Sequence, residues 1–251
     1  MPRFFVRQDA ICENEITLVG EDAHHVARSL RMAVGEEITV CDMQSNEYDC
    51  RIVSFNDDKE VRLEIVGVKH AENEPPCRIL LFQALPKGDK LDTVIQKAVE
   101  CGVSEIIPFE SEHCIVRVKA DAEERKTERR TRIAAEAAKQ CGRSVLPEVR
   151  RTVSFEEMIE LSRTCDLPLF CYEGDGTVPL GEVLSSNRSK LVSGASVAIV
   201  IGSEGGFSVR EALCAADAGL ISVGLGKRIL RTETASGFVL ACLSLVTELG
   251  V

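Results

Sequence analysis

The amino-acid sequence predicts an α/β protein with a small N-terminal β-barrel and a larger C-terminal domain built on a parallel sheet. Three observations lead to this fold class. Residues 1 to about 70 consist mainly of short apolar or β-branched runs, which is typical of strands. Residues 77–251 alternate between short apolar runs and helical patterns, which indicates a parallel sheet covered on both faces. The polar segment AENEPP, residues 71–76, separates the two patterns, so we expect domains at residues 1–72 and 73–251.

The N-terminal domain is expected to contain one short helix and five strands. The helix is predicted over Asp22–Leu30 and begins with an aspartate cap. The strands are predicted over Phe4–Val6, Glu15–Val19, Glu37–Cys41, Glu47–Ser54 and Val61–Val68.

Four arginines stand out in the first 31 residues, because they cluster near the first strand and the helix. They form either a basic rim on the barrel or ordinary solvated surface, and the sequence leaves both interpretations open. Two adjacent histidines of the helix are not spaced to share a metal ion on one face, so a structural role is favoured for them. The arginines are Arg3, Arg7, Arg28 and Arg31, and the histidines are His24 and His25.

The C-terminal domain is predicted from apolar runs that alternate with helix signals. Asp89 is expected to cap a helix that Gly102 ends, and residues 121–140 form a long helix. Ser154 and Ser208 are each followed three residues later by glutamate, which is the sequence pattern of a capping box. The strands are predicted over Arg78–Ala84, Ser104–Phe109, Leu146–Val149, Leu167–Tyr172, Val197–Ile201 and Leu220–Val223.

Composition excludes several classes of protein. No apolar run approaches the roughly 18 residues that a membrane span needs, and the N-terminus lacks the apolar core of a signal peptide. The eleven cysteines contain no CxxC pair, which argues against a disulfide framework and a structural zinc site. We therefore expect a cytoplasmic protein without a metal. The net charge of −10 makes an RNA substrate less expected but does not exclude it, because one face can still be basic.

Residues 125–143 carry seven basic residues against two acidic ones. One interpretation is a ridge that faces phosphates, since lysine and arginine supply affinity that is independent of sequence. The other is a solvated helix with pairs of opposite charge one turn apart. The nearby Arg143, Arg150 and Arg151 favour the ridge.

Two predicted strands near the end of the chain lead into glycine loops. The first loop contains Gly202, Gly205 and Gly206, and the second is Gly224-Leu225-Gly226. Ligands of open α/β sheets bind at the carboxyl ends of strands, so we expect the active site there. The chain lacks GxxxxGK[ST], a dinucleotide fingerprint, HExxH and GxSxG, which removes support for the corresponding enzyme classes. Bare backbone of this kind suits a planar base such as adenine.

The loop IGSEGGFS and the later LGKRILRTETA resemble motifs of the SPOUT superfamily of knotted RNA methyltransferases that use S-adenosyl-L-methionine. Within it the chain is most similar to the bacterial 16S rRNA (uracil-N3) methyltransferases. MPRFFV, HHVARSLRMAVGEEITVCD and QALPKGDKLDTVIQKAVECG extend the likeness along the chain. The superfamily's ribose methyltransferases have an asparagine-containing final motif instead of this one. Ser203 stands where a proline is common in the first loop.

The resemblance implies an N-terminal PUA-like domain that binds RNA, a C-terminal trefoil knot, and a homodimer with sites near the subunit interface. It implies that the partner is 16S rRNA in the 30S subunit and that the protein needs neither membrane nor metal. Three loops would bind S-adenosyl-L-methionine. Their residues are Cys171, Tyr172 and Glu173; Ile201, Gly202, Ser203, Gly205 and Gly206; and Leu225, Gly226, Ile229, Leu230, Thr232 and Thr234.

The catalytic candidates follow from their places in these motifs. Arg231 is expected to stabilise negative charge on a uracil oxygen. Glu204 is the first candidate for the base that accepts the proton and Glu233 the second. Either carboxylate could instead be structural, through hydrogen bonds in its loop or favourable charge at a helix start. RNA phosphates are assigned to Arg3, Arg7, Arg28, Arg31, Arg129, Arg130 and Arg143.

Two other functions remain compatible with the sequence. The chain could methylate another RNA, such as tRNA or 23S rRNA, or it could be a ribosome-assembly factor that binds RNA without catalysis. The intact glycine loops and RTETA motif argue against the second, because a decayed enzyme would lose side chains there first.

Overall fold

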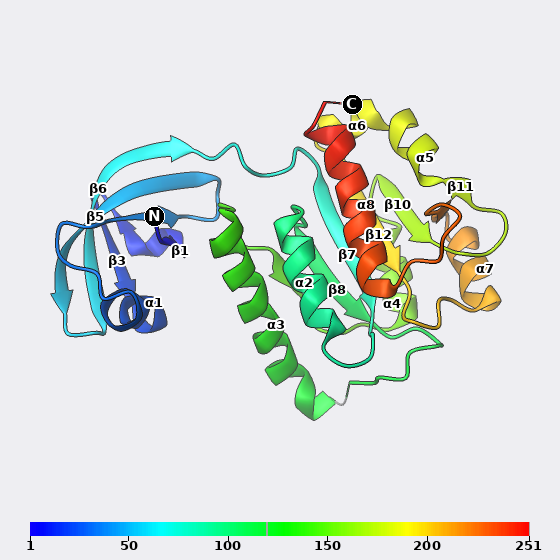
Figure 1. The fold of residues 1–251 in the computed structure, drawn as a ribbon, viewed down its shortest axis with the longest axis horizontal. Coiled ribbons are helices and arrows are strands. Elements are labelled where there is room, and N and C mark those ends of the chain that lie inside the picture. The colour runs from blue at the N-terminus through cyan, green and yellow to red at the C-terminus, as the bar shows by residue number, and fades with distance from the viewer. Residues whose placement is uncertain (119, 251) are drawn as a thin grey trace. The chain divides into compact units, whose positions relative to one another are not determined.

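The computed structural model describes residues 1–118 and 120–250 and divides into two compact units (Figure 1). The first unit comprises Met1–Glu74 together with Ala138–Leu146, and the second comprises Pro75–Ala137 and Pro147–Val251. The first unit is therefore built from two separate stretches of the chain.

The N-terminal unit is a six-stranded sheet that curls into a half-barrel. Its strand order is β1-β4-β5-β6-β3-β2, so β1 and β2 are free edges and the sheet does not close. All pairings are antiparallel except that between β1 and β4. The strands are β1 (Arg3–Phe5), β2 (Ile11–Cys12), β3 (Glu15–Val19), β4 (Glu37–Cys41), β5 (Asn46–Asn56) and β6 (Glu60–His70).

The core of this unit consists mainly of apolar side chains from alternating strand positions, as expected for a sheet with one buried face. They include Phe4, Ile16, Leu18, Ile38, Val40, Ile52, Val61 and Leu63.

The short helix of this unit begins earlier than the sequence predicted. Helix α1 covers Gly20–His24 and continues as a wider π-helical turn, η2 (His25–Ser29). Asp22 lies in the first turn and does not cap the helix, so the predicted aspartate cap was wrong. A 3-10 turn, η1 (Gln8–Ala10), precedes β2.

The end of the long helix α3 (Ala120–Cys141) and the loop after it belong to the N-terminal unit. Lys139 Nζ is 3.1 Å from Asp22 Oδ1 and lies 5.3 Å from the centre of the Phe4 ring. Arg143 forms an ion pair with Glu74, with Nε donating to Oε2 at 3.0 Å. Residues 138–146 thus complete the packing of the first unit.

The second unit contains a seven-stranded sheet in which every pairing is parallel. Its strand order is β11-β13-β10-β12-β7-β8-β9. Strands β10, β12 and β13, whose ends carry the glycine and cofactor motifs, are neighbours in the sheet. The strands are β7 (Arg78–Ala84), β8 (Glu105–Phe109), β9 (Glu148–Val149), β10 (Leu167–Cys171), β11 (Val178–Pro179), β12 (Ser196–Ile201) and β13 (Ile221–Gly224).

Helices cover the parallel sheet, with α2 and α8 in front of it and α4 behind it in Figure 1. Both predicted capping serines accept a hydrogen bond from the backbone N–H three residues on, and Ser208 forms a complete capping box with Glu211. Asp89 occupies the cap position of α2, but its side chain makes no capping bond, contrary to the prediction. The helices are α2 (Lys90–Glu100), α4 (Phe155–Ser162), α5 (Leu180–Ser186), α6 (Arg188–Val192), α7 (Val209–Asp217) and α8 (Thr232–Thr247).

The cysteines are all free thiols, which confirms that the chain has no disulfide framework. In the described part of the chain, no helix is both long enough and apolar enough to cross a membrane.

Candidate active site

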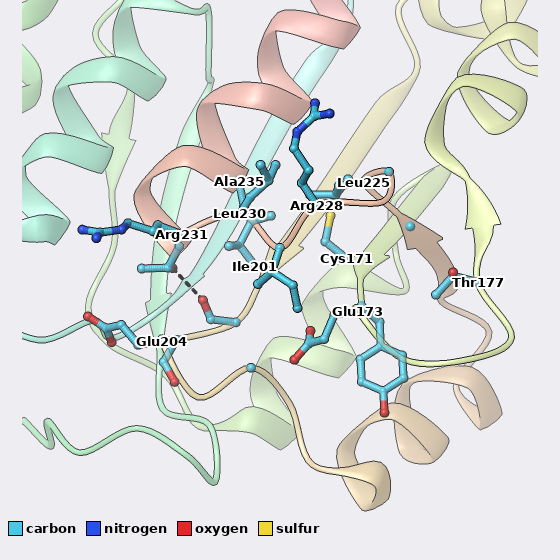
Figure 2. A pocket seen from close by; sticks show the side chains of 18 of the residues that line it. Cys171, Glu173, Thr177, Ile201, Glu204, Leu225, Arg228, Leu230, Arg231 and Ala235 are labelled. Carbon is cyan, nitrogen blue, oxygen red and sulfur yellow. Dashed lines mark hydrogen bonds between the residues drawn. The ribbon is translucent and has the colours of Figure 1, made fainter.

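Loops at the carboxyl ends of β10, β12 and β13 enclose a cavity of about 460 Å³. Its position agrees with the rule that open α/β sheets bind ligands beyond the carboxyl ends of their strands. Figure 2 shows the side chains of Cys171, Ile201 and Leu230 converging on this space from the three loops. The volume lies within the roughly 300–1,000 Å³ typical of small-molecule sites.

The loop after β12 depends on two glycines that no other residue could replace without rearrangement. Gly206 has a φ of +62°, and a Cβ at this position would overlap the carboxylate of Glu173. A Cβ on Gly202 would lie 3.2 Å from the backbone of Gly206. Phe207 anchors the loop in the core, because its ring centre lies 4.2 Å from that of Phe170. The loop is therefore tightly folded, and its backbone packs closely at both glycines.

A buried polar chain connects the glycine loop with the start of α8. Thr232 donates a hydrogen bond of 2.6 Å to the carbonyl oxygen of Gly202. The fully buried Gln83, at the end of β7, donates from Nε2 to Thr232 Oγ1 at 2.8 Å. Because a buried hydrogen bond is costly to break, this chain fixes the spacing between the two loops.

One wall of the cavity is apolar. Burial raises the pKa of the Cys171 thiol to about 12, so this side chain is neutral at physiological pH and acts as a small hydrophobic group. The other apolar residues of the wall are Ile201, Leu225, Leu230 and Ala235. A wall of this kind suits the face of an aromatic ring.

The opposite side carries a network of charges around Glu204. Its carboxylate accepts hydrogen bonds from the backbone N–H of Lys87 at 3.1 Å and from Lys90 Nζ at 2.8 Å. Lys90 Nζ also lies 3.8 Å from Glu233 Oε2. Partial burial acts to raise the pKa of Glu204, but the hydrogen bonds from Lys90 and from backbone N–H groups hold it below its ordinary value. Glu204 is therefore a firmly ionised carboxylate and a weak proton acceptor at neutral pH.

The third loop brings exposed cations to the cavity. Lys227, Arg228 and Arg231 all line it, and within the described residues none of the three forms an ion pair. Arg231 occupies the cap position of α8 and lies on the same side of the cavity as Glu204 in Figure 2. These three cations can accept an anionic ligand without first breaking an internal contact.

Most of the residues predicted to bind the cofactor line this one cavity. Their binding of the cofactor stays a prediction. Gly205 and Thr234 do not line it, and the Gly205 carbonyl lies 2.8 Å from His113 Nδ1 instead. Those that do line it are Cys171, Tyr172, Glu173, Ile201, Gly202, Ser203, Gly206, Leu225, Gly226, Ile229, Leu230 and Thr232.

Two of the three catalytic candidates, Arg231 and Glu204, line the cavity, and Glu233 does not.

Six residues that line the cavity were not predicted from the sequence. Lys90 follows β7, so the strand-end rule alone could have pointed to it, but its loop carries no glycine motif. The other five adjoin the predicted loops in sequence, and they are Thr177, Gly224, Lys227, Arg228 and Ala235.

Three of the arginines assigned to RNA have their guanidinium groups engaged inside the protein. Arg3 NH1 lies 2.5 Å from Glu47. Arg130 and Arg143 are buried, and Arg143 is paired with Glu74. These three offer little surface to a phosphate, so the burial does not support their assignment.

The remaining four arginines are exposed. Arg7 and Arg28 each have one acidic neighbour, at 3.7 Å and 3.1 Å respectively. Arg129 forms a two-point ion pair with Asp92, with NH1 and Oδ1 3.0 Å apart. Arg31 is exposed and has a positive φ of 53°. The predicted ridge on α3 is therefore weakened by internal pairing, whereas the N-terminal arginines stay accessible.

Within the described residues, no group of three or more histidine, cysteine, aspartate or glutamate side chains is arranged to hold a metal ion. The polar groups of the cavity include hydroxyls, carboxylates and cations, which suit an organic ligand with a charged part.

The fold and the cavity define the class of protein when they are compared with known families. A model of the RNA methyltransferase domain matches residues 73–244, and a model of the RNA methyltransferase PUA domain matches residues 18–66. The chain is therefore an RNA methyltransferase with a PUA domain, and the predicted resemblance is confirmed.

More narrowly, the chain belongs to the ribosomal RNA small subunit methyltransferase E family. It is 33% identical to the protein of that name from Bacillus subtilis over 252 residues, covering 99% of this chain and 98% of the relative. The relative of the same name from Mesomycoplasma hyopneumoniae is 31% identical over 240 residues and covers 96% and 97% of the two chains.

Solved structures agree with this assignment. The crystal structure of a ribosomal RNA small subunit methyltransferase E from Neisseria gonorrhoeae, bound to S-adenosyl methionine, is 30% identical with a TM-score of 0.83 and covers 98% of both chains. A putative methyltransferase from Legionella pneumophila, also in complex with S-adenosyl methionine, is 30% identical with a TM-score of 0.83 and covers 96% of both chains.

Proposed function

We propose that this protein transfers a methyl group from S-adenosyl-L-methionine to N3 of a uridine in 16S rRNA of the small ribosomal subunit. The observation that carries this proposal is the single cavity formed by the three motif-bearing loops of a chain that matches its family over its whole length. The uracil N3 target comes from the resemblance of the motifs, and the small-subunit substrate from the names of the relatives.

The residues of the cavity fit S-adenosyl-L-methionine by their chemistry. Leu225, Leu230 and Ile201 supply an apolar surface for adenine, and Glu173 supplies a carboxylate for hydroxyl or cationic groups. The close approach of backbone at Gly206 leaves room for a ligand where a side chain would otherwise stand. When bound, this cofactor supplies a methyl group that is already activated by the sulfonium charge.

The protein's own contribution is then to hold the uracil and to stabilise its charge. The imide N3 of uracil carries a proton at neutral pH, and loss of that proton places negative charge on N3 and the two ring oxygens. Arg231, an exposed cation at the edge of the cavity, stabilises this charge, and rigid positioning of both reactants contributes much of the rate.

The proposed role of Glu204 follows from its contacts. A carboxylate with a lowered pKa that already accepts bonds from Lys90 and a backbone N–H is better suited to holding the loop than to accepting a proton. Glu233 remains the second candidate for the proton acceptor. Its Oε2 is buried without a hydrogen-bond partner among the described residues.

We also propose that the protein acts as a homodimer in the cytoplasm and that its C-terminal domain contains a trefoil knot. Helix α8 supports the dimer, because it buries Val239 and Leu240 on one side and exposes Phe238 and Leu245 on another. A helix that is apolar on more than one face has a second surface to cover. The order of the parallel strands β13-β10-β12-β7 is compatible with a knotted connection.

The N-terminal unit is proposed to bind rRNA through Arg7, Arg28 and Arg31, which remain exposed. Contacts of this type add affinity without reading sequence.

The experiment that tests the proposed function compares methyl transfer from labelled S-adenosyl-L-methionine into isolated 30S subunits, 50S subunits and bulk tRNA. We expect incorporation into 30S subunits only, and mapping of the product should identify one N3-methyluridine. Labelling of tRNA or 50S subunits would favour another RNA substrate, and absence of S-adenosyl-L-methionine binding in calorimetry would favour a non-catalytic factor.

The variant Arg231→Ala should bind the cofactor normally and lose turnover. A normal rate of methylation in this variant would exclude Arg231 from the mechanism.

A further inference from the structure

We propose that Lys90 is a second cation of the active site, which contacts the target uracil and stabilises it after N3 has lost its proton. This inference rests on the proposed function and adds a catalytic residue to it. No glycine loop or RTETA motif contains Lys90, which reaches the cavity from a different strand end.

Lys90 lies at the edge of the cavity on a rigid part of the fold. Lys90 is the first residue of α2 and follows the carboxyl end of β7, the strand that pairs with β12. The inward face of α2, with Val94, Ile95 and Ala98, is buried in the core and fixes the orientation of its first turn. Lys90 lines the cavity, and about a third of its side chain remains exposed, so its ammonium group is both held and accessible.

Two carboxylates lie close to the ammonium group of Lys90. Lys90 Nζ lies 2.8 Å from Glu204 on the glycine loop and 3.8 Å from Glu233 in the first turn of α8. Two carboxylates from two different elements therefore hold one ammonium group between them. They limit its motion, which lowers the entropic cost of using it as a fixed cation.

The reaction creates negative charge on the uracil ring. When N3 of uracil loses its proton, the electron pair spreads over the two oxygens that flank N3 on opposite sides of the ring. Arg231 can lie against one of these oxygens, and a second cation can donate a hydrogen bond to the other. The other charged groups near Lys90 do not compete, because Asp92 on the same helix is paired with Arg129 and the side chain of Lys87 does not line the cavity.

The proposed step is balanced as follows. The N3 proton leaves to solvent water, the electron pair remains on the imide, and Lys90 and Arg231 keep their protons throughout. Transfer then forms the N3–CH₃ bond and breaks the S–CH₃ bond of the donor, which leaves a neutral thioether. Glu204 and Glu233 act as anchors for Lys90. In this step the N3 proton passes to water instead of to Glu233, the second candidate for the base.

The test is the pH dependence of kcat for methylation of 30S subunits by the wild-type protein and by Lys90→Met, Lys90→Arg and Lys87→Met. A cation within about 4–6 Å lowers the pKa of an acid by about one unit or more. Its loss in Lys90→Met should therefore move the apparent pKa of kcat upward by about one unit. The defect should be about tenfold at neutral pH and should disappear at high pH. Lys90→Arg should largely restore the wild-type profile.

Lys87→Met is the matched control, because it removes the same charge three residues away and leaves the Lys87 backbone N–H in place for Glu204. It should behave as wild type. Calorimetry should give the same affinity for S-adenosyl-L-methionine in all four proteins, and thermal denaturation should show that each is folded.

Four results would count against the inference or the function beneath it. A Lys90→Met defect that is equal at every pH, or a matching loss of cofactor affinity, would mean that Lys90 only supports the loop. A wild-type rate in Lys90→Met would also overturn the inference. Failure of the wild-type protein to methylate 30S subunits would instead overturn the proposed function, and the inference with it.

Discussion

The substitution Gly206→Ala tests the glycine loop most directly. Gly206 has a φ of +62°, where an L-residue other than glycine is strained by about 1–2 kcal/mol. For a chain of this size, that strain corresponds to a fall in Tm of about 2–8 °C. The new Cβ would also overlap the Glu173 carboxylate, which must turn away from its place in the cavity.

The effect on ligand binding should exceed the effect on stability. We expect the Kd for S-adenosyl-L-methionine, measured by calorimetry, to rise at least tenfold, or about 1.4 kcal/mol. Gly219→Ala is the matched control, because Gly219 has a φ of +89° but nothing within 4 Å of an added Cβ and does not line the cavity. It should lose a similar amount of Tm and keep its affinity. A Gly206→Ala protein with the wild-type Kd would refute the assignment of this loop to the cofactor.

Other predictions follow from the same structure. Thr232→Val should keep the shape of the side chain but remove its hydrogen bond with Gln83, which should lower the free energy of unfolding by about 1–3 kcal/mol in denaturant titrations. An unchanged free energy of unfolding would mean that these buried hydrogen bonds do not contribute to stability. Reversing the charge at Arg28 and Arg31 together should weaken binding to 30S subunits in a filter assay and leave cofactor affinity unchanged, whereas equal loss of both would indicate misfolding. The folded pKa of Glu204 lies below its ordinary value of 4.5, so its stabilising contribution is complete above that pH and is lost as the pH falls through the folded pKa. Glu204→Gln should therefore show a shallower loss of stability in acid, and an unchanged acid limb would contradict this.

The sequence predicted the layers of the fold because strand and helix periodicities are local signals. It could not predict β11 (Val178–Pro179), since a two-residue edge strand has no periodicity. The π-helical turn over His25–Ser29 was also missed, because nothing in the sequence of a short helix marks its end as wider than an α-helical turn.

The residues that line the cavity were easier to predict than the partners of the charged surface residues, because glycine loops are local in sequence. Glycines at strand ends leave a signature in one stretch of sequence, and the parallel sheet then brings the stretches together. The partner of a charged side chain is not encoded locally. Arg143 finds Glu74 at a distance of 69 residues along the chain, so its burial could not be read from the basic run in which it lies. Lys90 was missed for a different reason, because the loop between β7 and α2 carries no glycine motif although it follows a strand end.

The contribution of residues 138–146 to the N-terminal unit has a consequence for how this protein is made. The first 74 residues leave the ribosome long before the segment that supplies Lys139 and Arg143 as partners for Asp22 and Glu74. A fragment that ends at the AENEPP linker would lack both of these partners. A complete first unit therefore requires synthesis of part of the region that matches the RNA methyltransferase domain.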